Sequence, residues 1–210
     1  MSNPAIETVK AIKRCIQRDF FANESSKDSG IYQLTIVDEK SRQELNINTK
    51  NAAECLLLST DVDRNKDSNQ AKSIAKDSLL PFFEPTESGI TQQCDLILIG
   101  SRDENLFVFL IEMKQANKGH YLQQMKSSKL FVNFVLEILT LHSKCTAHPP
   151  HFFGVLCYGD QRRARNQPSK HLTFQFEERN GLHVSEWYAS SINLPALLSA
   201  ALRCVQGKAA

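Results

Sequence analysis

The sequence contains no apolar run close to the roughly 20 residues that a membrane-spanning helix requires. Its first residues, MSNPAIETVKAIKRC, lack the continuous apolar core that secretory signal peptides carry. Both of these usual signals for a membrane or secreted protein are therefore missing. We expect a cytoplasmic protein that does not associate with membranes.

An excess of charge of one sign is also missing. The chain has 25 Lys and Arg residues against 23 Asp and Glu residues, which gives a formal net charge of +2. Overall charge therefore gives no argument for binding to nucleic acid. A basic binding surface, if one exists, must be local.

The six cysteines include no C-x-x-C pair. In a chain of this size without a secretion signal, this pattern indicates reduced and mostly buried thiols rather than disulfides. Cys145, His148 and His151 occur at three-residue steps, but no second pair of zinc ligands follows them. A helix-to-strand loop explains this stretch more simply than a zinc site does.

What the chain does have is enough length and apolar content for one core. Its 210 residues are 41% hydrophobic and 23% charged, which is typical of a globular domain. We find no internal repeat and no low-complexity tract. We therefore expect a single domain over residues 1–210.

Hydrophobic periodicity predicts an α/β fold with a mixed sheet. Helical spacing is found over residues 4–21, 71–83, 121–142 and 194–205. Buried strands are predicted over 93–100, 106–114 and 152–159, and hairpins over 31–49 and 171–189. The second hairpin has an Asn-Gly turn at residues 180–181. Residues 51–60 fit either a short helix or a buried strand. The long helix 121–142 has a wide apolar face that includes Leu122, Met125, Leu130, Phe134, Leu136 and Leu141.

Three polar side chains stand at the ends of two predicted strands. Asp95 lies near the start of one strand, and Glu112 lies 17 residues later at the end of the next. The tight turn at 101–105 favours antiparallel pairing, which would bring Asp95 beside Glu112. Glu112 and Lys114 are two residues apart, so both point to one face of their strand.

Two neighbouring carboxylates repel each other, and each raises the pKa of the other. A divalent cation relieves this repulsion, and Mg²⁺ prefers carboxylate oxygens together with water or substrate phosphate. A lysine beside the metal can orient or deprotonate the attacking water, or stabilise charge on the phosphate. The three residues therefore suit the hydrolysis of a phosphodiester bond.

Asp95, the turn, Glu112-Met113-Lys114, the long helix and the strand after it resemble the PD-(D/E)XK nuclease superfamily. The resemblance covers about residues 70–160 and implies a restriction-endonuclease-like αβββαβ core, with a mixed central sheet flanked by helices. The N-terminal helix and hairpin and the C-terminal hairpin and helix would be additions to this core. Cys94 stands where the family pattern has proline, a structural position rather than a catalytic one.

The resemblance also implies roles for single residues. Asp95 and Glu112 would hold Mg²⁺ or Mn²⁺, with the Met113 carbonyl as a further ligand, and Lys114 would activate water. Some members of the family carry a glutamine on the helix that follows, a position that Gln123 or Gln124 would fill, and Gln124 is our choice. Many members also have an acidic residue upstream, for which the candidates are Glu7, Glu54 and Glu84.

Local basic stretches are candidates for contact with nucleic acid. They comprise Lys118 and Lys126 around the start of the long helix and Arg162, Arg163 and Arg165 after the strand at 152–159. Helix N-termini and arginine side chains both bind phosphate well. A solvated polar surface is the alternative interpretation of the same residues.

We therefore expect a metal-dependent nuclease, with DNA as the favoured substrate. No helicase or ATPase motif is present, so a protein partner or dimerisation would direct it to its target; a role in defence is an analogy. One alternative is a catalytically inactive nuclease-fold scaffold or binding module. Another is a different α/β fold, in which Glu112 and Lys114 form only an exposed ion pair.

Overall fold

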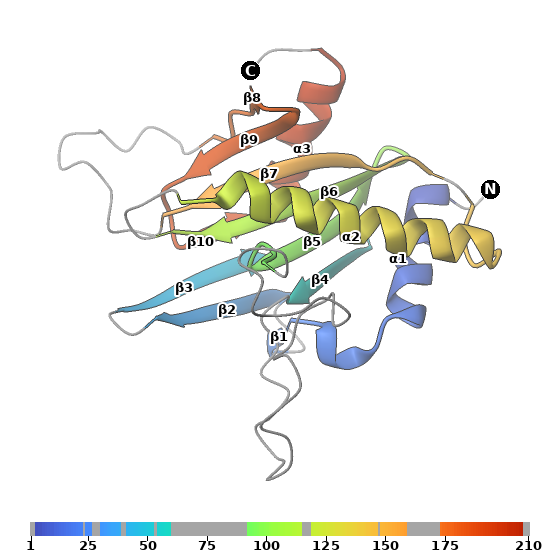
Figure 1. Ribbon diagram of the computed structural model, residues 1–210, viewed down its shortest axis with the longest axis horizontal. Coiled ribbons are helices and arrows are strands. Elements are labelled where there is room, and N and C mark those ends of the chain that lie inside the picture. The colour runs from blue at the N-terminus through green and yellow to red at the C-terminus, as the bar shows by residue number, and fades with distance from the viewer. Residues whose placement is uncertain are drawn as a thin grey trace, which may run out of the picture.

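The structure is a computed structural model that describes residues 3–22, 24–26, 30–38, 41–52, 54–59, 92–114, 119–146, 148–158 and 173–207. Its main body is a six-stranded mixed sheet (Figure 1). In spatial order the strands are β4 (Cys55–Ser59), β5 (Leu96–Arg102), β6 (Asn105–Met113), β7 (His151–Cys157), β9 (Leu182–Trp187) and β8 (Glu177–Arg179). β4, β5 and β6 pair in antiparallel fashion, and β8 pairs antiparallel with β9. β6, β7 and β9 run parallel. The predicted mixed α/β fold is thereby confirmed.

A second sheet joins the two ends of the chain. It contains β1 (Glu24–Ser26), β2 (Ile31–Asp38), β3 (Ser41–Asn48) and β10 (Ser191–Asn193), in that order. The β2–β3 pair is the hairpin predicted near the N-terminus, and β10 adds to it in parallel. This long-range pairing could not be predicted from local patterns, because β10 is only three residues long.

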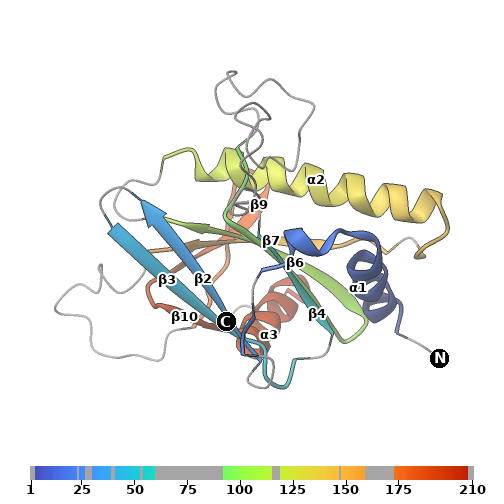
Figure 2. The ribbon, with the colours of Figure 1, turned by 90° about the horizontal axis from the view of Figure 1, so that it is seen from below.

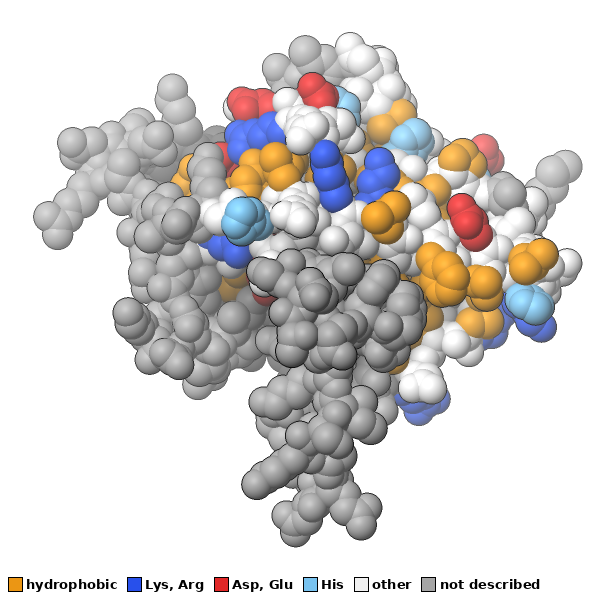
Figure 3. Space-filling model, in the orientation of Figure 1, with side chains coloured by type: hydrophobic (Ala, Val, Ile, Leu, Met, Phe, Trp, Pro, Cys, Tyr) orange, Lys and Arg blue, Asp and Glu red, His pale blue; other side chains and the backbone are white. Residues whose placement is uncertain are grey.

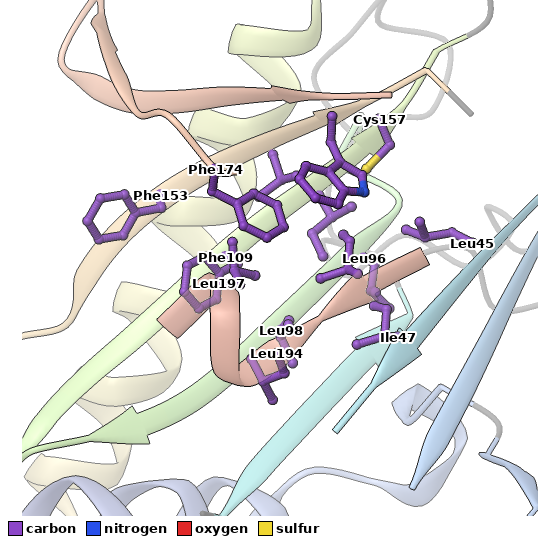
Figure 4. Close-up of a cluster of buried hydrophobic side chains, with 14 of the residues drawn as sticks. Leu45, Ile47, Leu96, Leu98, Phe109, Phe153, Cys157, Phe174, Leu194 and Leu197 are labelled. Carbon is purple, nitrogen blue, oxygen red and sulfur yellow. The ribbon is translucent and has the colours of Figure 1, made fainter. Parts of the chain in front are cut away.

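Helices cover both faces of the six-stranded sheet. α1 (Pro4–Cys15) and α2 (Tyr121–Leu141) pack against one face, and α3 (Leu194–Val205) packs against the other (Figure 2). On the α3 side, Leu45 and Ile47 of β3 complete a core with Phe109, Leu194 and Leu197 (Figure 4). Since both faces are covered, residues 106–113 of β6 are all buried, as their continuous apolar pattern predicts.

Local signals fix several element boundaries. Asn3 caps α1 through its side chain, and Asn193 caps α3 in the same way. Asn180 and Gly181 both have positive φ, which confirms the predicted hairpin turn. The ambiguous stretch 51–60 forms strand β4. The helix expected over 71–83 lies outside the described residues.

One prediction about the helices was wrong in detail, and one apolar helix face is only partly covered. α1 ends at Cys15 rather than near residue 21, because the chain becomes extended at Ile16 and turns to bring Phe21 into a bridge with Leu58. In α2, only part of the apolar face is buried. Met125 and Leu136 lie in the core, whereas Leu130, Phe134, Ile138 and Leu141 are exposed.

All six cysteines are free, as expected. The expectation that most are buried was wrong, because only Cys94 and Cys157 are fully enclosed. Within the part of the chain that the structure describes, no helix is both long enough and apolar enough to cross a membrane. The six-stranded sheet also extends past the expected core range of 70–160, since β4 lies before it and β9 lies after it.

Gly154 sets how closely α2 approaches the sheet. A Cβ atom at this position would lie 2.7 Å from the Met125 sulfur and 3.0 Å from Val184 Cγ2. We predict that Gly154→Ala lowers the free energy of unfolding by about 1–3 kcal/mol through overpacking. Gly100→Ala is the control, because its nearest new neighbour would be 3.6 Å away. Urea denaturation measures both variants, and equal stabilities would contradict this account of the packing.

Candidate metal and catalytic site

The candidate site lies where β5 begins and β6 ends. The antiparallel register pairs Leu96 with Ile111, so one step further places Asp95 opposite Glu112. Residues that face each other in this way project to the same side of the sheet. That side is covered by α2, since Ile97 and Leu110 of the same alternation belong to the core beneath the helix. The structure therefore brings the two carboxylates together.

Asp95 is tied to the neighbouring strand through the backbone. Its Oδ2 atom accepts a hydrogen bond from the Met113 N–H at 2.6 Å. This contact continues the pairing of β5 with β6 beyond Leu96 and Ile111, which form the last regular pair. It leaves the Asp95 side chain held beside Glu112. The role of the Met113 carbonyl as a metal ligand, which the family resemblance implies, stays a prediction.

Glu112 is a buried carboxylate, with only 1% of its side chain exposed. Its Oε1 atom lies 2.6 Å from Lys114 Nζ. Its Oε2 atom is buried and has no hydrogen-bond partner within the described residues. Burial raises the pKa of Glu112, and the hydrogen bond and charge of Lys114 oppose this shift without cancelling it.

Lys114 links the end of β6 to α2. Besides its ion pair with Glu112, its Nζ atom donates to Gln124 Oε1 at 3.2 Å. The Lys114 backbone N–H donates to the Cys157 carbonyl of β7 at 2.8 Å, which fixes the base of the side chain. Of the two glutamines considered from sequence, Gln124 is therefore the one at the site, and Gln123 is exposed.

The sequence analysis missed Ser128 and Gln93, which help to hold the segment that leads through Asp95 into β5. Ser128 Oγ accepts from the Cys94 N–H at 3.0 Å and donates to Gln93 Oε1 at 3.2 Å. Gln124 Nε2 lies 3.5 Å from the Gln93 carbonyl and donates to it. Ser128 follows Gln124 by four residues, so both lie on the helix face that meets the sheet. That spacing was the signal in the sequence that could have identified Ser128.

Cys94, at the position where the family pattern has proline, is fully buried. Burial raises the pKa of its thiol far above the usual range, and Cys157 behaves in the same way. Both therefore remain neutral thiols and serve as packing residues rather than nucleophiles.

A second ionic cluster flanks the site on β8 and β9. The Arg179 Nη1 atom donates to Glu186 Oε1 at 2.8 Å and to the Tyr121 hydroxyl at 3.3 Å. Tyr188 donates to the other Glu186 oxygen at 2.5 Å. The hydrogen bonds that Arg179 donates to Tyr121 and Glu186 raise the pKa of Arg179. Arg179 also pairs with Glu177 at 3.0 Å. The bond to Tyr121 fastens the first residue of α2 to the sheet.

Of the three upstream acidic candidates, the structure describes Glu7 and Glu54, and each is paired with a lysine. Glu54 precedes β4 at the end that pairs with Gly100, away from Asp95, and it lies 3.4 Å from Lys13. Glu7 is exposed on α1 and pairs with Lys10 at 3.1 Å. Glu84 lies outside the described residues. Among the residues that are described, no group of three or more His, Cys, Asp or Glu side chains is arranged to hold a metal.

Most of the basic candidates lie outside the described residues, namely Lys118, Arg162, Arg163 and Arg165. Lys126 is described, and it lies on α2 two positions after Gln124. It is half-buried on the outer side of the helix. Of these five basic candidates the structure therefore describes Lys126, which lies away from the helix face that packs on the sheet.

Comparisons of the chain with protein-family models, with curated proteins and with solved structures found no match. A functional conclusion for this chain must therefore come from the chemistry of the site.

The Ser128 contacts predict a stability effect. Ser128→Ala would leave the Cys94 N–H and the Gln93 side chain without their partner, which costs about 1–3 kcal/mol for buried groups. Ser127→Ala is the matched control, because its side chain is half-buried on the outer side of the helix. Thermal denaturation followed by circular dichroism compares the two. A Ser128→Ala protein as stable as the Ser127→Ala protein would contradict the role given to Ser128.

The raised pKa of Glu112 predicts that the stability of the protein in metal-free buffer depends on pH. Its folded-state pKa is raised above the ordinary value of 4.5, so the folded chain binds more protons than the unfolded chain in the window above that pH. Wild-type stability therefore falls as pH rises through this window. Glu112→Gln removes the buried charge, and we predict a higher melting temperature than wild type at neutral and mildly alkaline pH. The difference should shrink as pH falls toward 4.5.

Glu104→Gln is the control for this measurement, because Glu104 is an exposed carboxylate in the turn between β5 and β6, and this variant should melt close to wild type. A Glu112→Gln protein that melts below wild type at neutral pH would contradict the prediction. It would mean that the Lys114 ion pair outweighs the cost of burying the carboxylate.

Proposed function

We propose that this chain is a metal-dependent nuclease of the PD-(D/E)XK type. The observation that carries the proposal is the buried Glu112 carboxylate, which faces Asp95 and keeps one oxygen without a partner among the described residues. A buried acceptor of this kind is costly unless a ligand satisfies it. A divalent cation is the ligand that best fits two facing carboxylates.

The arrangement of elements supports the same proposal. β4, β5 and β6 follow one another along the chain and are neighbours in the sheet, and α2 and then β7 come after them. β7 pairs with β6 in parallel, so this part of the chain is compatible with the βββαβ portion of the proposed core. α1 is separated from β4 by β1, β2 and β3. The carboxylates and the lysine occupy one end of the two central strands.

Asp95 and Glu112 would hold Mg²⁺ or Mn²⁺ through their oxygens, and the remaining positions would be left to water and phosphate, as is usual for Mg²⁺. When bound, the metal supplies Lewis-acid polarisation of the phosphate and acidifies a coordinated water. Glu112 must be ionised to act as a ligand. Because burial raises the pKa of Glu112, its readiness to act as a ligand should increase as pH rises.

Lys114 would stand beside the metal. Its Nζ atom contacts both Glu112 and Gln124. Once the metal compensates Glu112, Lys114 would be released to bind the attacking water or a phosphate oxygen. Gln124 would hold the lysine chain in the direction of that phosphate, because its amide is anchored on the Gln93 carbonyl.

DNA is the substrate we favour, with a second copy of the chain or a targeting protein as partner. Lys126 would contribute a phosphate contact near the N-terminal part of α2. Lys118, Arg162, Arg163 and Arg165 remain candidates for the same role.

A second candidate function is an inactive scaffold with this fold. The observation that favours it is the short Glu112–Lys114 ion pair, which compensates the buried charge without any metal. A scaffold would keep this pair permanently and would need no cation at Asp95.

Cleavage assays test the proposed activity. We expect wild type to cut plasmid or single-stranded DNA with Mg²⁺ or Mn²⁺ and to be silent with EDTA. Asp95→Asn, Glu112→Gln and Lys114→Ala should each lower the rate by at least about 100-fold, because each removes a group that stabilises the transition state.

Glu54→Gln is the matched control, because Glu54 is ion-paired at the other end of the sheet. It should keep wild-type activity. Cutting that persists in all three site variants would exclude this site as the catalytic centre. A wild-type protein that cuts neither substrate with either metal would favour the scaffold.

A further inference from the structure

The outer side of α2 carries an exposed apolar stripe. Leu130, Phe134, Ile138 and Leu141 are 70%, 57%, 41% and 75% exposed, although each is large and hydrophobic. Their spacing of four, four and three residues places them along one side of the helix. Figure 3 shows orange side chains running over the C-terminal half of α2. A contiguous patch of this kind marks an interaction site more often than chance exposure does.

Charges border this stripe in a definite order. Lys126 precedes it and Glu137 lies within its C-terminal half. Eleven residues are close to three helical turns, so the two side chains lie on one line, about 16 Å apart along the helix. Figure 3 shows the basic side chains over the N-terminal half of α2 and an acidic one over its C-terminal half.

We propose that a second copy of this chain docks on the stripe through antiparallel pairing of the two α2 helices. A two-fold dimer uses the same patch on both copies, so the patch must complement itself. In this dimer a two-fold axis passes near Phe134 and makes the two α2 helices antiparallel. The flank of the stripe that carries Lys126 and Glu137 then lies on the same side of the helix pair in both copies. Lys126 of one copy then comes within about 8 Å of Glu137 of the other along the helix axis, a distance that the two long side chains can span.

The charge order selects this arrangement over its alternative. Parallel pairing of the helices about a two-fold axis would place the flank that carries Lys126 and Glu137 on opposite sides of the helix pair, so neither residue would meet the opposite charge. Antiparallel pairing makes the Lys–Glu contact twice and buries the apolar stripe between the helices. The stripe spacing of three and four residues also suits interlocking helix packing.

This dimer does not depend on the proposed nuclease activity, but it would determine how two sites are placed. Gln124 lies ten residues before Phe134 in α2. The two candidate sites would therefore lie near opposite ends of the helix pair, about 30 Å apart along its axis.

Sedimentation velocity and light scattering on the full chain, over a wide range of concentrations, test the proposal. We expect a wild-type dimer. Phe134→Glu should raise the dimer dissociation constant by at least about 100-fold, because each dimer loses two buried aromatic side chains. Val205→Glu is the control, since Val205 is 40% exposed on α3 and lies away from the stripe. It should remain dimeric.

A charge exchange tests the pairing itself. Lys126→Glu and Glu137→Lys should each weaken the dimer, and the protein with both changes should recover it. Circular dichroism verifies that each variant is folded. A monomeric wild type, or a dimer that Phe134→Glu leaves intact, would overturn the proposal. The first result would mean that another molecule or another part of the chain covers the stripe.

Discussion

The burial of the Glu112 carboxylate is the constraint on which the rest of the site depends. It sits at the end of β6, a strand covered on both faces, so it cannot reach water without breaking the packing of α2 against the sheet. Lys114 forms an ion pair with the Oε1 atom of Glu112, and the Oε2 atom has no hydrogen-bond partner among the described residues. Burying a charge is expensive, and such an arrangement persists where it serves a purpose.

The helix α2 connects this site to the remainder of the molecule. Its inner face supplies Gln124 and Ser128, which hold Lys114 and the backbone at residues 93–94. Its first residue, Tyr121, is fastened by Arg179 to β9 through Glu186. Its outer face carries the apolar stripe that we assign to a second copy of the chain. A single helix therefore positions the candidate chemistry and offers the candidate interface.

The local pattern of the sequence was sufficient for the central strands and for the meeting of Asp95 with Glu112. Continuous apolar runs identify β5 and β6, and a tight turn between them determines their register. The pairing of β10 with β3 could not be predicted, because a three-residue strand has no periodicity and its partner is more than 140 residues away. The exposure of Leu130 and Phe134 was also missed, since periodicity shows that a face is apolar and does not show what covers it. Ser128 was overlooked because serine is common on polar helix faces, and only its distance of four residues from Gln124 distinguishes it.

The most direct test of the account is titration calorimetry of the folded protein with Mn²⁺ in buffers that differ in ionisation enthalpy. If Asp95 and Glu112 form a metal site, the wild type should bind Mn²⁺ and release a proton, and the release should decline as pH rises and Glu112 becomes ionised beforehand. Glu112→Gln should bind far more weakly and release no proton. The absence of Mn²⁺ binding by wild type, or binding that Glu112→Gln leaves unchanged, would contradict the central claim that this buried carboxylate is a metal ligand.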